Sequence, residues 1–503
     1  MSEAASTIVS APGKVLITGG YLVLERPNRG LVVSVGSRFY TIIESLARSA
    51  AKNDFEDSTI EVVSPQFNKT EKFTVRFSPT LTVRASDSTP NPFIHFAVQH
   101  VLLVAWSLLG ESFKQRLGSA LRVTILGSND YYSQREQIRL RGLSLNSKSL
   151  AALPKFLPPD ITSDAEGKKH VAKTGLGSSA ALVTSLVASL LHHLKIVSLD
   201  DSSNEAFRAA DLELVHVISQ YSHCRAQGKI GSGFDVSAAT FGSQRYVRFS
   251  PTVLNSLLNS YGPDDTPTAD SVVTCVLPGT HRLASPHQEQ KHYAWNHEHV
   301  PFVLPKGLGM MVGEVDGGSN TPLLVSQVLK WKATKVDEAN ENWRKLSAAN
   351  DHIEEQFHWL VTLRDRSPDE YEGALNVCGR VPFDGWSEKG GGASSQVVTT
   401  LIDIHNTFTS IRELLREMGS LAGVPIEPSE QTHRADVTMT LPGVLMSGVP
   451  GAGGFDAIFA IFIEGPARSA IEESWLQLSV CPLLCSEPNT GVSVHRNDPR
   501  TLG

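Results

Sequence analysis

The chain has 503 residues, of which 41% are hydrophobic and 19% are charged, a balance typical of globular proteins with large cores. This length predicts two or three domains. A formal net charge of -7 argues against nucleic acid or an anionic membrane surface as a general partner. The five cysteines are scattered, which argues against a disulfide framework and favours a reducing, cytoplasmic location. Neither a signal peptide nor an apolar run of membrane-spanning length is expected.

The first part of the chain is predicted to be mostly strands. Short β-rich runs alternate with polar segments, and one apolar stretch repeats with helical spacing. The expected strands cover 7–9, 15–18, 31–35, 39–43, 60–63, 73–77 and 121–125, and the expected helix covers 93–109. Lys14 follows a predicted Pro-Gly turn and precedes a strand. Taken alone it is more often a surface lysine, and the alternative is a fixed cation that points into a cleft.

The first motif with chemical meaning covers 173–181 and has the sequence KTGLGSSAA. Gly175 and Gly177 can adopt backbone angles denied to other residues and let a ligand approach the main chain. Ser178 or Ser179 can cap the helix predicted to follow. Amide groups and the dipole at such a helix start favour an anion, most often phosphate. No Gly-Lys-Ser/Thr closes the loop, so it is not a Walker A motif, and a plain helix start is the alternative interpretation.

The second motif covers 227–235 and follows an amphipathic helix predicted over 203–222. Its sequence, QGKIGSGFD, places a lysine, a serine and an aspartate in a loop with three glycines. Asp235 is predicted to lie at the N-terminus of a short helix, where an N-cap role is the simpler interpretation. An aspartate held beside a lysine could also accept a hydroxyl proton.

Linker composition near 261–268 predicts a domain boundary, with one domain over 1–260 and a second over 261–503. The second half is expected to hold a Gly/Ser-rich loop at 387–395. The remaining predicted strands cover 246–249, 309–315 and 458–463. A helix containing Leu323, Leu324, Val328 and Leu329 is predicted after the polar segment 316–321, and further helices are predicted at 335–364, 396–421 and 467–476. The third glycine motif, SGVPGAGGFDA, ends at residue 457 and offers backbone N–H donors close to a ligand. A tight β-turn is the alternative there.

Four histidines gather in the segment 287–299. A metal site is the less favoured interpretation, because their spacing matches no closed set of zinc ligands. Cys481 and Cys485 have no companion pair and are predicted to be free thiols.

The glycine motifs, taken together and in this order, resemble the three signatures of the GHMP kinases. The likeness extends over 10–461, and its finer details resemble the fungal-type phosphomevalonate kinases of that family. It rests on Ala11–Lys14, Gly19–Leu24, Lys173–Ala180, Gln227–Asp235 and Gly451–Asp456. The resemblance implies a two-domain α+β fold, with an N-terminal domain like domain 2 of ribosomal protein S5 and a ferredoxin-like C-terminal domain. It also implies that ATP and Mg²⁺ bind in the cleft between them.

The activity implied by the resemblance is transfer of the ATP γ-phosphoryl group to 5-phosphomevalonate, giving 5-diphosphomevalonate and ADP in the mevalonate route to isoprenoids and sterols. Such a kinase would be a monomer or homodimer, without a nucleic-acid or membrane partner. Mevalonate kinase, the decarboxylase of diphosphomevalonate and a non-catalytic ligand sensor of the same fold remain as alternatives.

The resemblance also implies roles for individual residues. Asp235 and Lys14 would be catalytic, with the aspartate orienting the acceptor and the lysine offsetting charge on the transferred group. Ser179 would bind Mg²⁺ through its hydroxyl. The implied nucleotide-binding residues are Lys173, Gly175, Leu176, Gly177, Ser178, Ser179 and Ala180. The implied substrate-binding residues are Tyr21, Gln227, Lys229, Ser232, Arg245, Gly451, Ala452, Gly453 and Gly454. One family feature is missing, because 222–227 lacks the glutamate that several relatives use as a second Mg²⁺ ligand.

Overall fold

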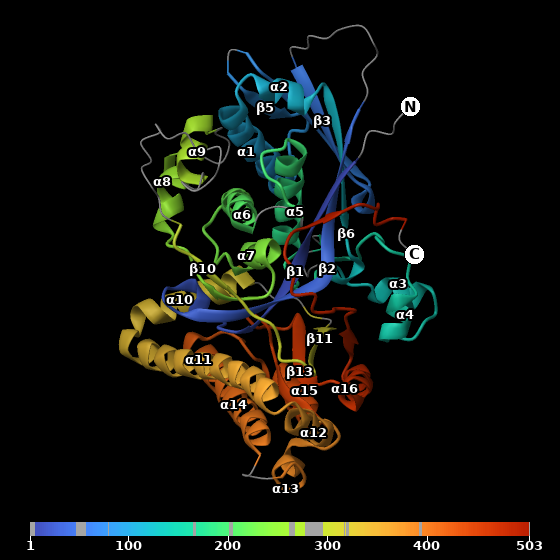
Figure 1. The fold of residues 1–503 in the computed structure, drawn as a ribbon, viewed down its shortest axis with the longest axis vertical. Helices are drawn as coiled ribbons and strands as arrows, with labels where there is room; N and C mark the ends of the chain where they lie inside the picture. Colours follow the sequence, from blue (N-terminus) through green and yellow to red (C-terminus); the bar gives the residue numbers. More distant parts are fainter. Residues whose placement is uncertain are drawn as a thin grey trace.

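The computed structural model describes residues 6–46, 57–78, 80–163, 167, 169–200, 205–260, 267–276, 295–315, 317, 321–391 and 395–501. Two main β-sheets organise this part of the chain, and each carries packed helices (Figure 1). The large sheet lies in the upper part of the figure and the small sheet in the lower part. Residues from both halves share one hydrophobic core, so the two halves are packed together over their common border.

The large sheet has the strand order β10-β9-β2-β6-β3-β4-β5, with β1 paired to β2 and β15 paired to β1. The pairing is antiparallel except between β3 and β6, which are parallel. Its strands are β1 (Thr7–Thr18), β2 (Arg29–Ser45), β3 (Asp57–Ser64), β4 (Lys69–Arg76), β5 (Thr82–Ala85), β6 (Ala120–Gly127), β9 (Gln244–Val247), β10 (Glu298–Pro301) and β15 (Ser493–His495). A separate ribbon contains β7 (Ile161–Ser163) and β8 (Lys169–Val171).

The turn predicted around Pro12 is wrong, because β1 continues without interruption and pairs with β2 on both sides of it. A shift of register between Pro12 and Gly13 takes the place of the turn. Such an irregularity accommodates a proline, which has no N–H to give to the ladder. The two strands predicted at 31–35 and 39–43 are likewise one strand, β2. Lys14 therefore projects from the middle of a strand held by its neighbours.

Helices cover one face of the large sheet (Figure 1). α5 packs against β1 and β2, and α1 and α6 pack against α5. The helices of this part are α1 (Pro92–Leu109), α2 (Ser112–Leu117), α3 (Arg135–Leu140), α4 (Ser147–Ala151), α5 (Ser178–His193), α6 (Glu205–Gln227), α7 (Phe234–Phe241), α8 (Thr252–Ser260) and α9 (Ala269–Val276). The helices predicted at 93–109 and 203–222 are confirmed, and α6 continues for about one more turn.

α1 is long and apolar enough to cross a membrane by length and composition, which the sequence did not lead us to expect. It is the one such helix among the described residues. However, 56% of its window is buried inside the molecule, and it packs against α5, α6 and α9. This burial is typical of a core helix in a folded domain.

The small sheet is antiparallel and has the strand order β12-β13-β11-β14. Its strands are β11 (Leu308–Val315), β12 (Val444–Gly448), β13 (Ala457–Ile463) and β14 (Val480–Pro482). In chain order a strand, a set of helices, two strands, α16 and a last strand follow one another, which is the ferredoxin-like arrangement. The predicted α+β fold with a ferredoxin-like C-terminal domain is therefore confirmed.

The two faces of the small sheet are covered by different helices. Alternate side chains of β13 face opposite sides, as a pleated strand requires. Phe462 packs in a cluster with Trp475 of α16, while the Phe459 ring lies 5.7 Å from that of Phe408 on α14. The helices are α10 (Thr321–Thr334), α11 (Val336–Arg366), α12 (Pro368–Cys378), α13 (Trp386–Lys389), α14 (Gln396–Ala422), α15 (Ser429–Met439) and α16 (Pro466–Gln477).

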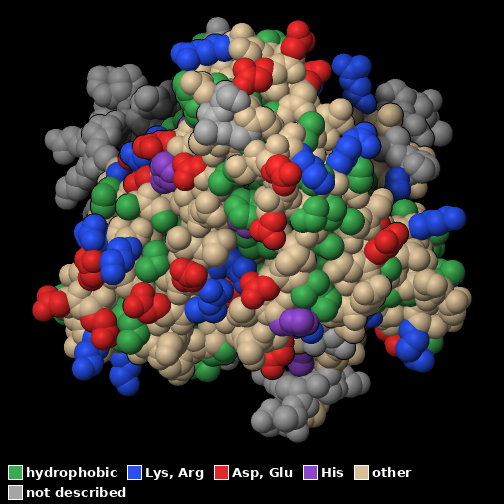
Figure 2. Space-filling model, turned by 90° about the horizontal axis from the view of Figure 1, so that it is seen from below, with side chains coloured by type: hydrophobic (Ala, Val, Ile, Leu, Met, Phe, Trp, Pro, Cys, Tyr) green, Lys and Arg blue, Asp and Glu red, His purple; other side chains and the backbone are tan. Residues whose placement is uncertain are grey.

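The long helices predicted at 335–364 and 396–421 correspond to α11 and α14, which pack against each other. The loop predicted at 387–395 is partly helical, because α13 occupies its first residues, and 392–394 lie outside the described residues. On the face seen in Figure 2, acidic and basic side chains are interspersed. α11 contributes pairs of this kind, such as Glu341 with Arg344 at 2.9 Å.

The boundary predicted between 260 and 261 falls between α8 and α9. Beyond that point α9 still packs against α1, β10 pairs with β9, and β15 pairs with β1 at the end of the chain. We therefore infer that the first domain extends to β10 and includes β15.

Candidate active site

The loop between β8 and α5 is attached to β1 through Lys14. The Lys14 backbone N–H donates to the Leu176 carbonyl at 2.9 Å, and Nζ donates to the Gly175 carbonyl at 3.0 Å. Lys14 Nζ also lies 5.3 Å from the centre of the Phe234 ring, in the second motif. These contacts hold the lysine between the first and second motifs.

Gly177 is a position where a side chain does not fit. Its φ is 81°, in the left-handed region that favours glycine. A Cβ there would lie 3.1 Å from Lys14 Cε and 3.8 Å from Asp235 Cβ. The backbone at Gly177 thus lies directly against both residues predicted to be catalytic.

The predicted capping of α5 by Ser178 or Ser179 is wrong, because Gly177 is the N-cap and no side chain caps the helix. The Ser179 hydroxyl is instead hydrogen bonded to Nε2 of His223 on α6, at 3.1 Å. Burial lowers the pKa of His223, with Asp235 opposing the shift and Lys173 adding to it. A neutral imidazole can accept a hydrogen bond from the hydroxyl and so orient the Ser179 oxygen.

Asp235 lies in the first turn of α7, at the helix N-terminus as predicted, while Gly233 is the N-cap. Its Oδ1 accepts a hydrogen bond from the Val236 N–H at 3.0 Å. The loop before it is held by Tyr246, whose hydroxyl donates to the Ser232 carbonyl at 2.9 Å. Gly233 has a φ of 84°, and a Cβ there would lie 2.8 Å from the Tyr246 oxygen.

Arg248, which the sequence did not lead us to predict, holds the same loop from the end of β9. Its Nη2 donates to the carbonyls of Ile230 at 3.1 Å and Gly231 at 2.6 Å, and its Nη1 donates to the Leu24 carbonyl. The guanidinium therefore joins the second motif to the short helix η1 (Leu22–Leu24).

The third glycine motif contacts the first half of the chain at two points. The Tyr21 hydroxyl donates to the Ala452 carbonyl at 2.8 Å, and the Gly451 N–H donates to the Leu16 carbonyl at 3.3 Å. Tyr21 is buried, and burial raises its pKa, so the hydroxyl remains a donor at neutral pH.

The remaining glycines of the third motif are fixed to the segment before α15. The Gly454 N–H donates to the Ile426 carbonyl at 2.8 Å. Gly453 has a φ of 72°, and a Cβ there would lie 2.0 Å from the same carbonyl oxygen. The motif is therefore anchored within the second half on one side and touches β1 on the other.

A cavity of about 660 Å³, here called the acceptor cavity, lies where the three motifs, α10 and β11 meet. It has walls from both sheets, so each half of the chain contributes to it. The predicted site residues that line it are Lys14, Tyr21, Gly175, Leu176, Gly177, Gln227, Lys229, Ser232, Asp235, Gly451, Ala452 and Gly453.

A second cavity of about 550 Å³, here called the apolar cavity, lies behind the first motif. Lys173, Ser178 and Ser179 line it, together with aromatic and aliphatic side chains. These side chains are Phe39, Phe67, Phe93, Ile94, Ile125, Tyr132, Val171 and Leu182. The first motif therefore separates two cavities, one lined by Lys14 and Asp235 and the other mainly apolar.

Three predicted site residues do not line either cavity. Arg245, predicted to bind substrate, faces Glu298 at 3.8 Å and Glu354 at 3.7 Å, so its charge is matched within the protein. Ala180 is buried in the first turn of α5, and the N–H of Gly454 is bonded to the Ile426 carbonyl. The geometry offers Arg248 rather than Arg245 as the arginine next to the acceptor cavity.

Comparison with known proteins decides the family. Over 99% of its length the chain is 39% identical to the peroxisomal phosphomevalonate kinase of Arabidopsis thaliana, and the match covers 97% of that protein. It is 32% identical to the phosphomevalonate kinase of Aspergillus fumigatus, over 94% of this chain and 91% of that one. The chain belongs to the phosphomevalonate kinase family. No protein-family model matches it.

Solved structures similar to this family member agree on the fold. A Lin0012 protein from Listeria innocua has a TM-score of 0.58 at 16% identity, covering 98% of this chain and all of that one. The phosphomevalonate kinase of Streptococcus pneumoniae, in complex with phosphomevalonate and AMPPNP, has a TM-score of 0.52 at 15% identity. That match covers 95% of this chain and 99% of the other.

Two lysines at the cavities of this phosphomevalonate kinase family member have shifted pKa values. Burial lowers the pKa of Lys14, and the charge of Asp235 opposes the shift. Burial also lowers the pKa of Lys173 at the apolar cavity. A bound anion would stabilise the charged form of each lysine, so both positions favour an anionic ligand.

The residues in and beside the first motif include oxygen groups of the kind that Mg²⁺ binds together with phosphate and water. Ser179 offers a hydroxyl at the apolar cavity and Asp235 a carboxylate at the acceptor cavity, one on each side of the first motif. Mg²⁺ commonly takes one or two protein oxygens. His223 occupies the stretch in which the sequence lacks a glutamate. The hydrogen bond between His223 and Ser179 could not be predicted from sequence spacing, because the two residues lie on different helices.

Proposed function

We propose that this family member transfers the γ-phosphoryl group of ATP to the phosphate of 5-phosphomevalonate, giving 5-diphosphomevalonate and ADP. The observation that carries the proposal is the position of the first motif between the two cavities, with Lys14 and Asp235 on the acceptor side. The names of the curated relatives support this choice of substrates, and so do the phosphomevalonate and AMPPNP bound to the Streptococcus pneumoniae kinase.

The nucleotide would span the first motif. Its base would occupy the apolar cavity, where aromatic and aliphatic side chains suit a flat heterocycle. Its phosphates would bind the N–H groups at the start of α5, where the helix dipole favours negative charge. The γ-phosphate would then reach Gly177, beside the acceptor cavity.

The transfer step requires positioning and charge neutralisation more than proton removal. A phosphate monoester acceptor is already largely deprotonated near neutral pH, so a strong general base is not needed. Lys14 would neutralise charge on the transferring group, and Asp235 would fix the lysine and the acceptor in line. Mg²⁺, held by Ser179 and ATP oxygens, would supply further neutralisation of the phosphates.

The far end of the substrate would meet residues from the second motif. Lys229 and Ser232 line the acceptor cavity and can bind a phosphate or carboxylate group. Gly451, Ala452 and Gly453, with α10 beside them, would cover the cavity from the second half. A monomer or homodimer in the cytoplasm stays a prediction, and the Arabidopsis relative is named as peroxisomal.

The test is release of ADP with 5-phosphomevalonate or mevalonate as acceptor, in the presence of ATP and Mg²⁺. We expect turnover with 5-phosphomevalonate to exceed turnover with mevalonate by a large factor. Preference for mevalonate would overturn the acceptor assignment. ATP binding without ADP release in the presence of either acceptor would favour the ligand sensor.

A further inference from the structure

A cluster of three ligand-type side chains lies outside both cavities. Glu213 and His216 belong to α6, and His297 comes immediately before β10. One ligand atom from each lies within 4.8 Å of the others. None of the three lines either cavity, so the cluster is separate from the proposed kinase site.

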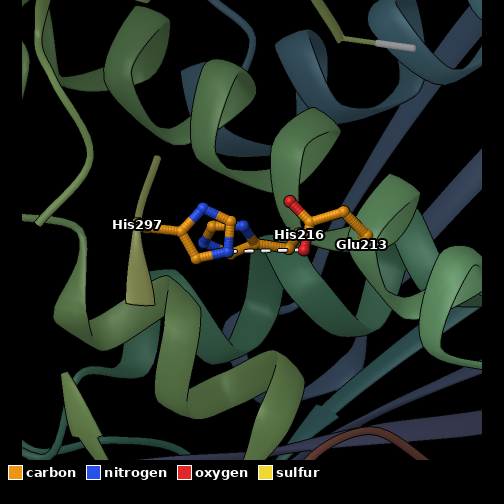
Figure 3. Close-up of side chains that lie close together, drawn as sticks. All are labelled: Glu213, His216 and His297. Carbon is orange, nitrogen blue, oxygen red and sulfur yellow. Dashed lines mark ion pairs between the residues drawn. The ribbon is translucent and has the colours of Figure 1, made fainter. Parts of the chain in front are cut away.

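The geometry of the cluster follows from helical spacing and one distant contact. Glu213 and His216 are three residues apart, so they share a face of α6. His297 Nε2 lies 3.3 Å from Glu213 Oε2, and the His297 and His216 rings are 4.3 Å apart between centres. Figure 3 shows the Glu213 carboxylate pointing toward the two imidazole rings.

The polar atoms of these histidines lack ordinary partners in the described part of the chain. Both ring nitrogens of His216 are buried there without a hydrogen bond, and so are those of His297, whose Nε2 only approaches Glu213. Buried polar groups in folded proteins nearly always have a partner. Two imidazoles without hydrogen bonds, facing one carboxylate, therefore point to a missing ligand.

We propose that Glu213, His216 and His297 bind one Zn²⁺ ion, with a fourth position open to water. Two imidazole nitrogens and one carboxylate oxygen are a ligand set that Zn²⁺ uses. The same set is unfavourable for Mg²⁺, which prefers oxygen ligands, so the proposed ion is distinct from the one used with ATP.

Aromatic side chains lie beside the cluster. Trp295 and Phe241 stand on two sides, with ring centres 6.1 and 5.2 Å from that of His216. His299 is stacked on Phe241 at 3.7 Å and lies 5.4 Å from His297.

The expected role of the ion is structural. It would join α6 to the start of β10, two elements that are far apart in the chain. α6 carries His223 toward the first motif, and β10 pairs with β9, so the ion would fix the helix relative to the sheet.

The experiment measures zinc binding to the full chain rather than kinase activity. Protein stripped with a chelator is titrated with Zn²⁺ against a chromophoric zinc indicator, and its melting temperature is recorded with and without Zn²⁺. We expect one ion per chain and a higher melting temperature with Zn²⁺.

Two variants and a control make the assignment specific. Glu213→Gln and His297→Gln should each weaken Zn²⁺ binding more than about tenfold, since even residues that only support a metal ligand cost about 10–100-fold. His358→Gln, at an exposed histidine of α11, should bind as the wild type does. Absence of Zn²⁺ binding by the wild type, or equal binding by all the variants, would overturn the proposal.

Discussion

The two halves of the molecule contribute different chemical groups to the acceptor cavity. The first half supplies charged side chains, Lys14 from β1, a strand of the large sheet, and Asp235 from α7, which packs against β1 and β2. The second half supplies the third glycine motif, including Asp456, and one side of α10. The two residues predicted to be catalytic are therefore placed on rigid elements of the first half, where reacting groups need exact positions.

Because the two halves contribute different groups, we expect substitutions in each half to have different effects. Changes in the first half should lower turnover while leaving the fold intact. Changes in the second half should lower stability or binding with smaller effects on turnover. The boundary between the two classes lies where the third motif touches β1 and the residues that follow it, at Tyr21 and Gly451.

The largest effect is expected for the charged pair. Lys14→Met and Asp235→Asn should each lower kcat by about 10² or more. The first variant loses the cation that neutralises the transferring phosphoryl group, and the second loses the carboxylate that positions this lysine and the acceptor. The measurement is ADP release at saturating ATP and 5-phosphomevalonate. Asp270→Asn, at an exposed aspartate of α9, is the control and should keep full turnover. Near-normal kcat in either variant would give that residue a structural role.

The sequence alone was sufficient to predict the long helices and the residues that belong to each glycine motif. Long helices and the glycine loops have local signals, such as spacing and backbone freedom, that one stretch of chain contains by itself. Arg245 is an example of a residue whose partners such local signals do not predict. It and Arg248 lie three residues apart near β9, so they face opposite sides of the strand. Only the packed sheet shows that the first faces Glu354 and the second faces the cavity loop.

The same limit explains the two errors in the first sheet and the missed histidine. Pro12 and the segment 36–38 have turn composition, but pairing on both sides keeps them extended. His223 meets Ser179 only because α5 and α6 pack side by side. Tertiary pairing of this kind is set by the whole fold and has no signal in a short window of sequence.

A second prediction tests whether Gly177 is needed for its backbone angle or for its neighbours. Gly177→Ala combines a left-handed φ with a Cβ 3.1 Å from Lys14, so we expect kcat to fall by roughly tenfold or more. Gly423→Ala has a similar φ of 67° and open space around it, so it should cost only about 1 kcal/mol of stability. Equal turnover in the two variants would show that contact with Lys14 is unimportant.

Within the second half, Gly453→Ala should mainly destabilise the protein. The added Cβ would lie 2.0 Å from the Ile426 carbonyl oxygen, so the third motif must move, at a cost of about 1–3 kcal/mol. Gly451→Ala shares the left-handed φ and has no neighbour within 4 Å, so it separates strain from overlap. Urea unfolding measures both. A loss of turnover in Gly453→Ala as large as in Lys14→Met would contradict the division between the halves.

The smallest effect is expected at the junction itself. Tyr21→Phe removes the hydroxyl that donates to Ala452 but keeps the buried ring, so stability should fall by about 1 kcal/mol. Because Tyr21 lines the acceptor cavity, KM for the acceptor should rise slightly while kcat stays within about twofold, an energy below about 1 kcal/mol. Urea unfolding and steady-state kinetics test both statements. If kcat fell as far as in Asp235→Asn, the tyrosine hydroxyl would belong to the reacting groups, and the backbone of the second half would share in the chemistry.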